Sequence, residues 1–135
     1  MRIVIDANVM IAAFATRGLC ESVLEACLNK HEIILSEDLL DEILKNLHYK
    51  IKLPKSMTDQ VASLLRGFAI FVDPVPLSSD ACRDPDDIKI LGLAVASEAD
   101  YIISGDKDLL VLKRFQGISV LSPRAFYEIL QGETN

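Results

Sequence analysis

Short runs of β-branched residues alternate along the chain with longer segments whose hydrophobic residues recur at helical spacing. The runs of strand type are residues 2–5, 33–35, 101–104 and 118–121. A shorter run at residues 71–73 stands before Pro74 and Pro76, which predicts one short strand followed by a loop. Because strands that alternate with helices favour parallel pairing, the pattern predicts an α/β protein with a parallel sheet covered by helices on both faces.

Four helices are predicted to begin at residue types that cap helix N-termini, namely Ser36, Ser56, Asp84 and Ser122. Ser56 forms a capping-box pattern with Asp59, and proline follows both Asp84 and Ser122, as is typical of a first helical position. In residues 37–48 and 56–70 the hydrophobic side chains fall on one stripe of the helix, so each helix can pack on the sheet. The pattern contains no repeat or linker, and we expect a single domain over residues 1–135.

Composition supports a folded domain and limits the cellular locations and the kinds of ligand that fit the protein. A chain of 135 residues, 50% hydrophobic and 25% charged, can bury a core. Its apolar stretches are too short to cross a membrane and its start lacks a signal-peptide pattern, which predicts a cytoplasmic location without membrane contact. Cys20, Cys27 and Cys82 do not have the spacing of a disulfide framework, and we expect reduced, mostly buried thiols. The net charge of −6 argues against a protein that binds nucleic acid by coating phosphates with basic side chains.

Four acidic residues fall where the carboxyl ends of parallel strands meet the starts of the following helices. Asp6 and Asp106 follow predicted strands, whereas Glu42 lies in the second turn of one predicted helix and Asp87 in the first turn of another. Open α/β sheets form their sites at this edge. Carboxylates so close together raise one another's pKa values unless a cation lies among them. Because all of these ligands are oxygens, the cation is expected to be Mg²⁺ or Mn²⁺ rather than zinc.

Each of these acids also has a purely structural interpretation. Asp84 and Asp86 stand at a helix start, where acids commonly cap the helix and interact with its dipole. An aspartate at the end of a strand, such as Asp6 or Asp106, is often a turn residue, and Glu42 could be a solvated helix residue. Two strand-end aspartates at one sheet edge favour the site interpretation.

Lysines surround the predicted connection between the first and second of these helices, at Lys45, Lys50, Lys52 and Lys55. They form either an ordinary solvated face or a rim that guides phosphate groups of a substrate.

Five segments, in their order and spacing, resemble those of PIN-domain ribonucleases, most closely the VapC-like toxin components of toxin–antitoxin systems. The segments are residues 4–9 (VIDANV), 35–44 (LSEDLLDEIL), 84–94 (DPDDIKILGLA), 99–110 (ADYIISGDKDLL) and 118–126. The resemblance covers nearly the whole chain and implies a three-layer α/β/α fold with a central parallel sheet of about four to five strands. Ala7 stands where threonine is usual and Ile88 where a polar residue is common, and neither departure removes a ligand.

By this resemblance the catalytic and metal-binding positions of the family match Asp6, Glu42, Asp87 and Asp106. Auxiliary positions match Asn8, Ser104 and Asp108. The implied activity is hydrolysis of RNA phosphodiester bonds with Mg²⁺ or Mn²⁺ by the toxin of a toxin–antitoxin pair. The implied partners are RNA, an antitoxin protein and further copies of the chain in a homodimer or higher oligomer.

Other classes of protein fit the residues less well. A haloacid-dehalogenase-like phosphatase needs a second aspartate where this chain has Asn8, and a response-regulator receiver needs an aspartate near residue 50, where residues 49–52 read YKIK. The remaining alternative is a catalytically silent PIN-like module that binds RNA or protein. All four acids are present, so a lack of catalytic activity would have to arise elsewhere in the chain.

Overall fold

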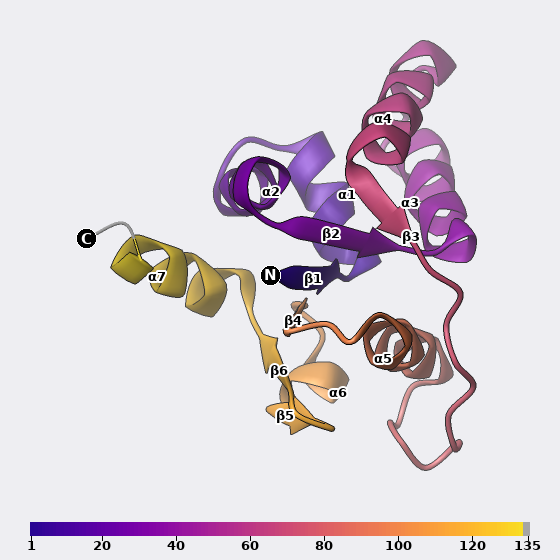
Figure 1. Cartoon of the computed structure of the whole chain (residues 1–135). Helices are drawn as coiled ribbons and strands as arrows, with labels where there is room; N and C mark the ends of the chain where they lie inside the picture. Colours follow the sequence, from indigo (N-terminus) through magenta and orange to yellow (C-terminus); the bar gives the residue numbers. More distant parts are fainter. Residues whose placement is uncertain (134–135) are drawn as a thin grey trace.

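A single sheet lies at the centre of the computed structural model, which describes residues 1–133 (Figure 1). Its strands are β1 (Arg2–Ile5), β2 (Glu32–Leu35), β3 (Ala69–Phe71), β4 (Tyr101–Ile103), β5 (Arg114–Phe115) and β6 (Ile118–Leu121). They lie in the order β3-β2-β1-β4-β6-β5, and every neighbouring pair is parallel except β5 and β6. The predicted mainly parallel sheet is therefore confirmed, with the antiparallel edge strand β5 as an addition to the predicted strands.

Helices cover both faces of this sheet (Figure 1). The described part of the chain contains α1 (Ala7–Ala15), α2 (Leu19–Lys30), α3 (Glu37–Tyr49), α4 (Lys55–Phe68), α5 (Pro85–Ser97), α6 (Lys107–Leu110) and α7 (Pro123–Glu133). Helices α1 to α4 lie on one side and α5 and α6 on the other, whereas α7 packs against α2 and β6. The predicted three-layer α/β/α arrangement is therefore confirmed. Among these helices there is none with the length and apolar character that crossing a bilayer requires.

The central strands are buried on both of their faces. Ile3, Val4 and Ile5 of β1 are at most 1% exposed, although successive side chains of a strand point to opposite faces. Such a strand needs a hydrophobic layer on each face of the sheet. Helix α5 packs against β1 on one face, and α1 lies on the other. This burial fixes the position of the carboxyl end of β1, where Asp6 follows.

Two predicted boundaries were wrong. The strand expected at residues 71–73 is β3, which ends at Phe71, and Val72 adds only one further backbone hydrogen bond to Leu35. Helix α4 begins at Lys55, so Ser56 is already inside the helix and does not cap it. Pro54 precedes this helix instead, with a backbone already fixed near the φ of a helix start. The other three predicted helix starts are confirmed, since Ser36, Asp84 and Ser122 each accept a backbone N–H bond.

A segment without regular secondary structure, residues 72–84, crosses α5 at Gly92. The Val75 N–H donates to the Gly92 carbonyl oxygen over 3.2 Å, and a Cβ at Gly92 would overlap the carbonyl oxygen of Val75. At its other end, the Cys82 thiol donates to the Asp108 carbonyl oxygen over 3.4 Å. The segment is thus held on α5 and α6 immediately before the acids that begin at Asp84.

Replacing Gly92 with alanine is expected to lower the free energy of unfolding by about 1–3 kcal/mol, because the new methyl group meets backbone and the segment must move. Gly67 in α4 provides the control, since its Cβ would meet open space and Gly67→Ala is expected to stabilise the protein by about 0.5–1 kcal/mol. Urea denaturation of the two variants measures the difference. Equal stabilisation by both would contradict the close approach at Gly92.

Candidate metal centre

The strand order diverges between β1 and β4, and the carboxyl ends of these two strands meet there. Within the sheet, β2 is the neighbour of β1 on one edge, whereas β4, followed by β6, is its neighbour on the other edge. Ile5 is in register with Ile103, and the Asp6 N–H donates to the Ile103 carbonyl oxygen over 2.9 Å. Asp106 follows β4 three residues after Ile103. The two strand-end acids therefore lie at the point where open α/β sheets form their sites.

Ser104 links these two acids. Its hydroxyl donates to Asp6 Oδ2 over 2.6 Å and accepts from the Asp106 N–H over 2.9 Å. The Asn8 N–H donates to Asp6 Oδ1 over 3.3 Å, so Asp6 also caps α1. Because Ser104 is fully buried, these bonds hold the carboxylate of Asp6 in one orientation.

Six acidic side chains line one cavity of about 110 Å³ at this edge. They are Asp6, Glu42, Asp84, Asp86, Asp87 and Asp106. The structure thus brings all four predicted metal-binding acids together, with Asn8 beside them. Asp84 caps α5 as expected, accepting from the Asp86 N–H over 2.9 Å, and it lines the cavity as well.

Burial and mutual repulsion make these carboxylates hard to ionise together. Burial, followed by the charges of Asp106 and Asp84, raises the pKa of Asp87 to about 7. Burial also raises the pKa of Asp6, and the hydrogen bond from Ser104 opposes that increase. The pKa of Glu42 is raised by its partial burial and by the charges of Asp6 and Asp86.

The residues present fit a hard divalent cation. Asp87 is only 6% exposed, and its Oδ2 atom has no hydrogen-bond partner within residues 1–133. A buried carboxylate oxygen without a partner is unfavourable, and a cation would satisfy it. The side chains around it offer carboxylate oxygens and the amide of Asn8, which is the donor set that Mg²⁺ and Mn²⁺ prefer.

Three acids form a close set that differs from the predicted four. Oxygen atoms of Asp84, Asp87 and Asp108 all lie within 4.8 Å of one another. The sequence analysis assigned Asp84 only a capping role and Asp108 an auxiliary one. A signal was present, because acids three residues apart at a helix start lie on one face of the helix.

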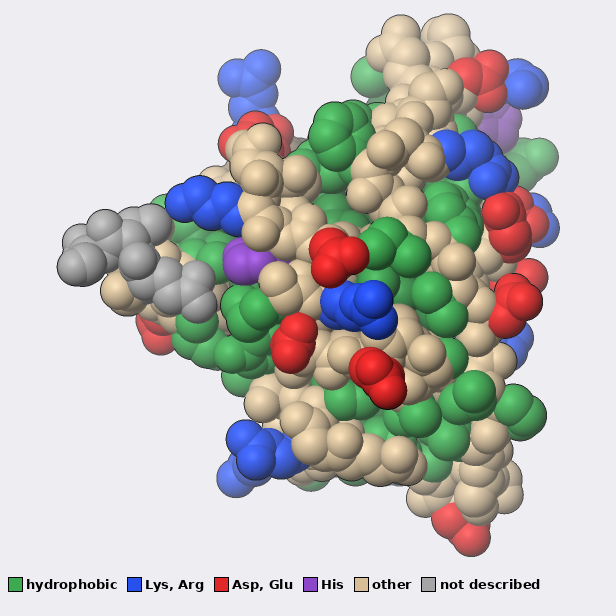
Figure 2. All heavy atoms as spheres, in the orientation of Figure 1, with side chains coloured by type: hydrophobic (Ala, Val, Ile, Leu, Met, Phe, Trp, Pro, Cys, Tyr) green, Lys and Arg blue, Asp and Glu red, His purple; other side chains and the backbone are tan. Residues whose placement is uncertain are grey.

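The predicted lysine rim lies at the surface, outside the lining of the acidic cavity. Lys45, Lys50, Lys52 and Lys55 are all exposed, and Lys55 forms an ion pair with Asp59 over 3.4 Å. The sequence analysis missed Lys89, which lines a neighbouring groove of about 190 Å³ together with Asp38, Glu42 and Asp86. Figure 2 shows basic and acidic side chains interspersed on the face that it draws.

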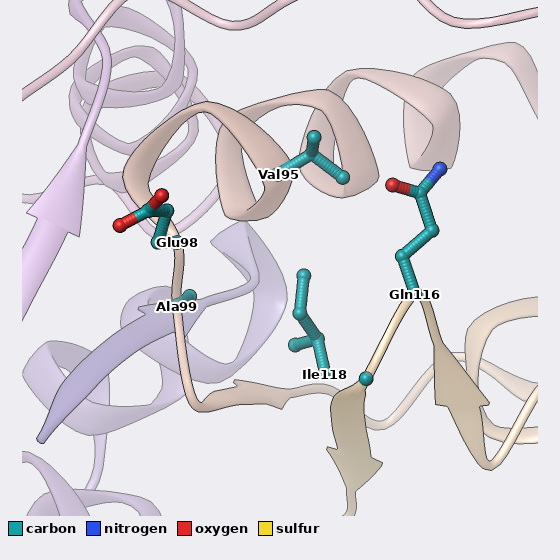
Figure 3. Close-up of a pocket in the computed structure, with 6 residues that line it drawn as sticks. Val95, Glu98, Ala99, Gln116 and Ile118 are labelled. Carbon is teal, nitrogen blue, oxygen red and sulfur yellow. The ribbon is translucent and has the colours of Figure 1, made fainter.

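A second cavity, of about 230 Å³, lies at the opposite end of α5. Figure 3 shows Val95 and Glu98 near the end of this helix, with Gln116 of the β5–β6 turn and Ile118 of β6 extending toward it. Glu98 is the one acidic side chain in the lining. A hard cation needs several oxygen ligands, so the acidic cavity is the better candidate for a metal centre.

The PIN domain family model matches residues 2–108, and the chain therefore belongs to the PIN domain family. A chain of the crystal structure of VapBC2 from Rickettsia felis, bound to a DNA fragment from their promoter, is similar with a TM-score of 0.63. The sequence identity is 15%, and the match covers 90% of this chain and 98% of that chain. At this identity the likeness shows the fold. No curated protein matches the chain. The family and fold predicted from the sequence are thereby confirmed.

Proposed function

We propose that the protein is a divalent-metal-dependent endoribonuclease that hydrolyses RNA phosphodiester bonds as the toxin of a toxin–antitoxin pair. The observation that carries the proposal is the cavity at the β1–β4 divergence, into which Asp6, Glu42, Asp87 and Asp106 all face. Membership of the PIN domain family and the structural likeness to VapBC2 support it. The three cysteines are free thiols, as expected for a protein of the reducing cytoplasm.

In this proposal Asp6 and Asp106 are direct ligands of Mg²⁺ or Mn²⁺, and Asp87 binds directly or through water. The metal, when bound, activates a water molecule and offsets charge on the scissile phosphate. Glu42 lines both the acidic cavity and the neighbouring groove, so its carboxylate is placed either to bind the metal or to accept a proton from the attacking water. Ser104 acts through Asp6, whose carboxylate it orients.

Substrate phosphates must approach an acidic cavity, which requires compensating positive charge. Lys89 lies in the groove next to the cavity, and its charge lowers the pKa of Glu42, as does that of Lys50. We assign both lysines to the path of the RNA backbone, with Lys45, Lys52 and Lys55 farther along the exposed rim.

We further propose an antitoxin partner and self-association. The similar structure, VapBC2, is of a complex. An arginine of an antitoxin could enter the acidic cavity, because a guanidinium group can replace the charge of the metal. Large hydrophobic side chains are exposed on α3, α4 and β3 and on the connection between α3 and α4, which supports contact with another copy of the chain. They are Tyr49, Ile51, Met57, Phe68 and Ile70.

Purified protein is expected to cleave single-stranded RNA with Mg²⁺ or Mn²⁺, to stop in EDTA, and to recover when Mn²⁺ is added in excess of the chelator. Gel analysis of an end-labelled RNA measures cleavage. Asp80→Asn is the matched control, because Asp80 is exposed and lies outside the cavity, and it should cleave like the wild type. Cleavage that persists in EDTA would contradict the proposal. Binding of the RNA without cleavage under any metal would favour the silent module instead.

A further inference from the structure

We propose that the groove next to the acidic cavity binds the base of the nucleotide that flanks the scissile phosphate, and that Asp38 selects guanine there. The inference rests on the proposed function, which brings RNA to the acidic cavity, and it adds a base preference to that function.

The groove is continuous with the acidic cavity, because Glu42, Asp86 and Ile90 line both. It runs between α3 and α5 and has a volume of about 190 Å³. A phosphodiester carries a nucleoside on each side, so an RNA whose phosphate lies in the cavity must place a neighbouring nucleoside in an adjoining space. The groove provides that space.

The charges in the groove suit a neutral base better than a second phosphate. Of its six lining residues three are acidic and one, Lys89, is basic. This excess of negative charge repels phosphate, whereas an uncharged base donates hydrogen bonds to carboxylates. Leu39 and Ile90 line the groove and are only 5% and 7% exposed, so they form an apolar floor for a planar ring. Lys89 is exposed and remains available to the RNA backbone beside the base.

Asp38 is the acid that is free to contact the base. It lines the groove but not the acidic cavity, whereas Glu42 and Asp86 line both. Asp38 is exposed, and within residues 1–133 its carboxylate has no hydrogen bond or ion pair, since the ion pairs there involve other acids. Both of its oxygens can therefore accept hydrogen bonds from a ligand.

Guanine matches a free carboxylate better than the other RNA bases do. An ionised carboxylate accepts hydrogen bonds and donates none. Guanine presents two adjacent donors on one edge, N1–H and the N2 amino group, and the two carboxylate oxygens can accept both. Adenine and cytosine present only an amino group on that edge, and uracil only N3–H. A bidentate pair of this kind discriminates between bases by about 5- to 150-fold.

Cleavage of short RNAs that differ in one nucleotide at the cleavage site tests the inference. The wild type is expected to show a kcat/KM at least about fivefold higher next to guanosine than next to uridine. Asp38→Asn should bring this ratio close to one, because an amide offers one acceptor and one donor in place of two acceptors. Asp41→Asn is the matched control and should keep the wild-type ratio, since Asp41 is exposed on the same helix and lines neither the groove nor the cavity. Circular dichroism melts verify that both variants are folded.

A second measurement does not depend on cleavage. Titrations with 5′-GMP and 5′-UMP, which differ only in the base, are followed by NMR in EDTA. GMP is expected to shift the amide signals of residues 38–42 and 86–90 more strongly than UMP does. Asp38→Asn should remove this difference, and Asp41→Asn should retain it.

The outcomes separate this inference from the proposed function. Equal kcat/KM values for the four bases, or a guanosine preference that persists in Asp38→Asn, would overturn the base site while leaving a metal-dependent nuclease intact. Signals that shift only in other parts of the chain would overturn it as well. GMP binding that requires Asp38, without RNA cleavage under any metal, would support the base site and contradict the proposed nuclease.

Discussion

Asp6→Asn is expected to reduce RNA cleavage by at least about 100-fold while leaving the metal-free protein as stable as the wild type or more stable. The substitution removes a proposed metal ligand and one charge from a crowded cavity. Burial already raises the pKa of Asp6, which means that its ionised form is unfavourable in the folded state. Asparagine has nearly the same shape and retains an oxygen for the bond from Ser104 or for the cap at Asn8.

Thermal melts with and without Mg²⁺, run beside an RNA cleavage assay, measure both parts of this prediction. The increase in melting temperature that Mg²⁺ produces in the wild type should be much smaller in Asp6→Asn, because the variant binds the ion less tightly. A purely structural Asp6 predicts the opposite pattern, with a lower metal-free melting temperature and near-normal cleavage. That pattern would remove Asp6 from the metal centre.

The metal-free protein is expected to lose thermal stability as the pH rises from about 4 to about 7. The pKa of Asp87 is about 7 in the folded protein and close to its ordinary value of 3.8 in the unfolded chain. Because the folded state holds this proton more tightly, the stabilisation is complete below the unfolded pKa and disappears as the pH passes through the folded pKa. Asp6 and Glu42, whose pKa values are also raised, act in the same direction.

Mg²⁺ is expected to reverse this dependence, since the ion binds the ionised carboxylates and stabilises the folded state most at high pH. Melting temperatures measured across this range, with EDTA or with Mg²⁺, test the prediction. Asp87→Asn should flatten the metal-free curve, whereas Asp80→Asn, at an exposed position, should leave it unchanged. A wild-type melting temperature that rises with pH in EDTA would contradict the assigned proton on Asp87.

The position of the acidic centre could be predicted because it follows from strand order alone. Asp6 and Asp106 come directly after short hydrophobic runs, and parallel strands bring such positions to one edge whatever the remaining side chains do. The capping residues Ser36, Asp84 and Ser122 could be predicted as well, because their hydrogen bonds are made to residues two or three positions away. Features that depend on local sequence, such as strand ends and helix caps, could therefore be predicted.

Features that depend on distant contacts could not be predicted. The proximity of Asp108 to Asp84 and Asp87 requires α6 to pack beside the start of α5, and no local pattern encodes that contact. Strand β5 has two residues, too few for an alternating pattern, and its turn at Gln116 and Gly117 uses positive φ at both positions. Helix α4 begins earlier than its capping pattern indicates, because Pro54 already sets the backbone for a helix start.

The bond between Ser104 and Asp6 also sets when, during synthesis, the centre can exist. It joins residues 98 positions apart in the chain, and the register of β1 beside β4 joins segments equally distant. A growing polypeptide therefore cannot orient Asp6 in this way until Ser104 has left the ribosome. If the protein is the proposed nuclease, the nascent chain cannot cleave RNA before that point, because the carboxylate of Asp6 is not yet held in place.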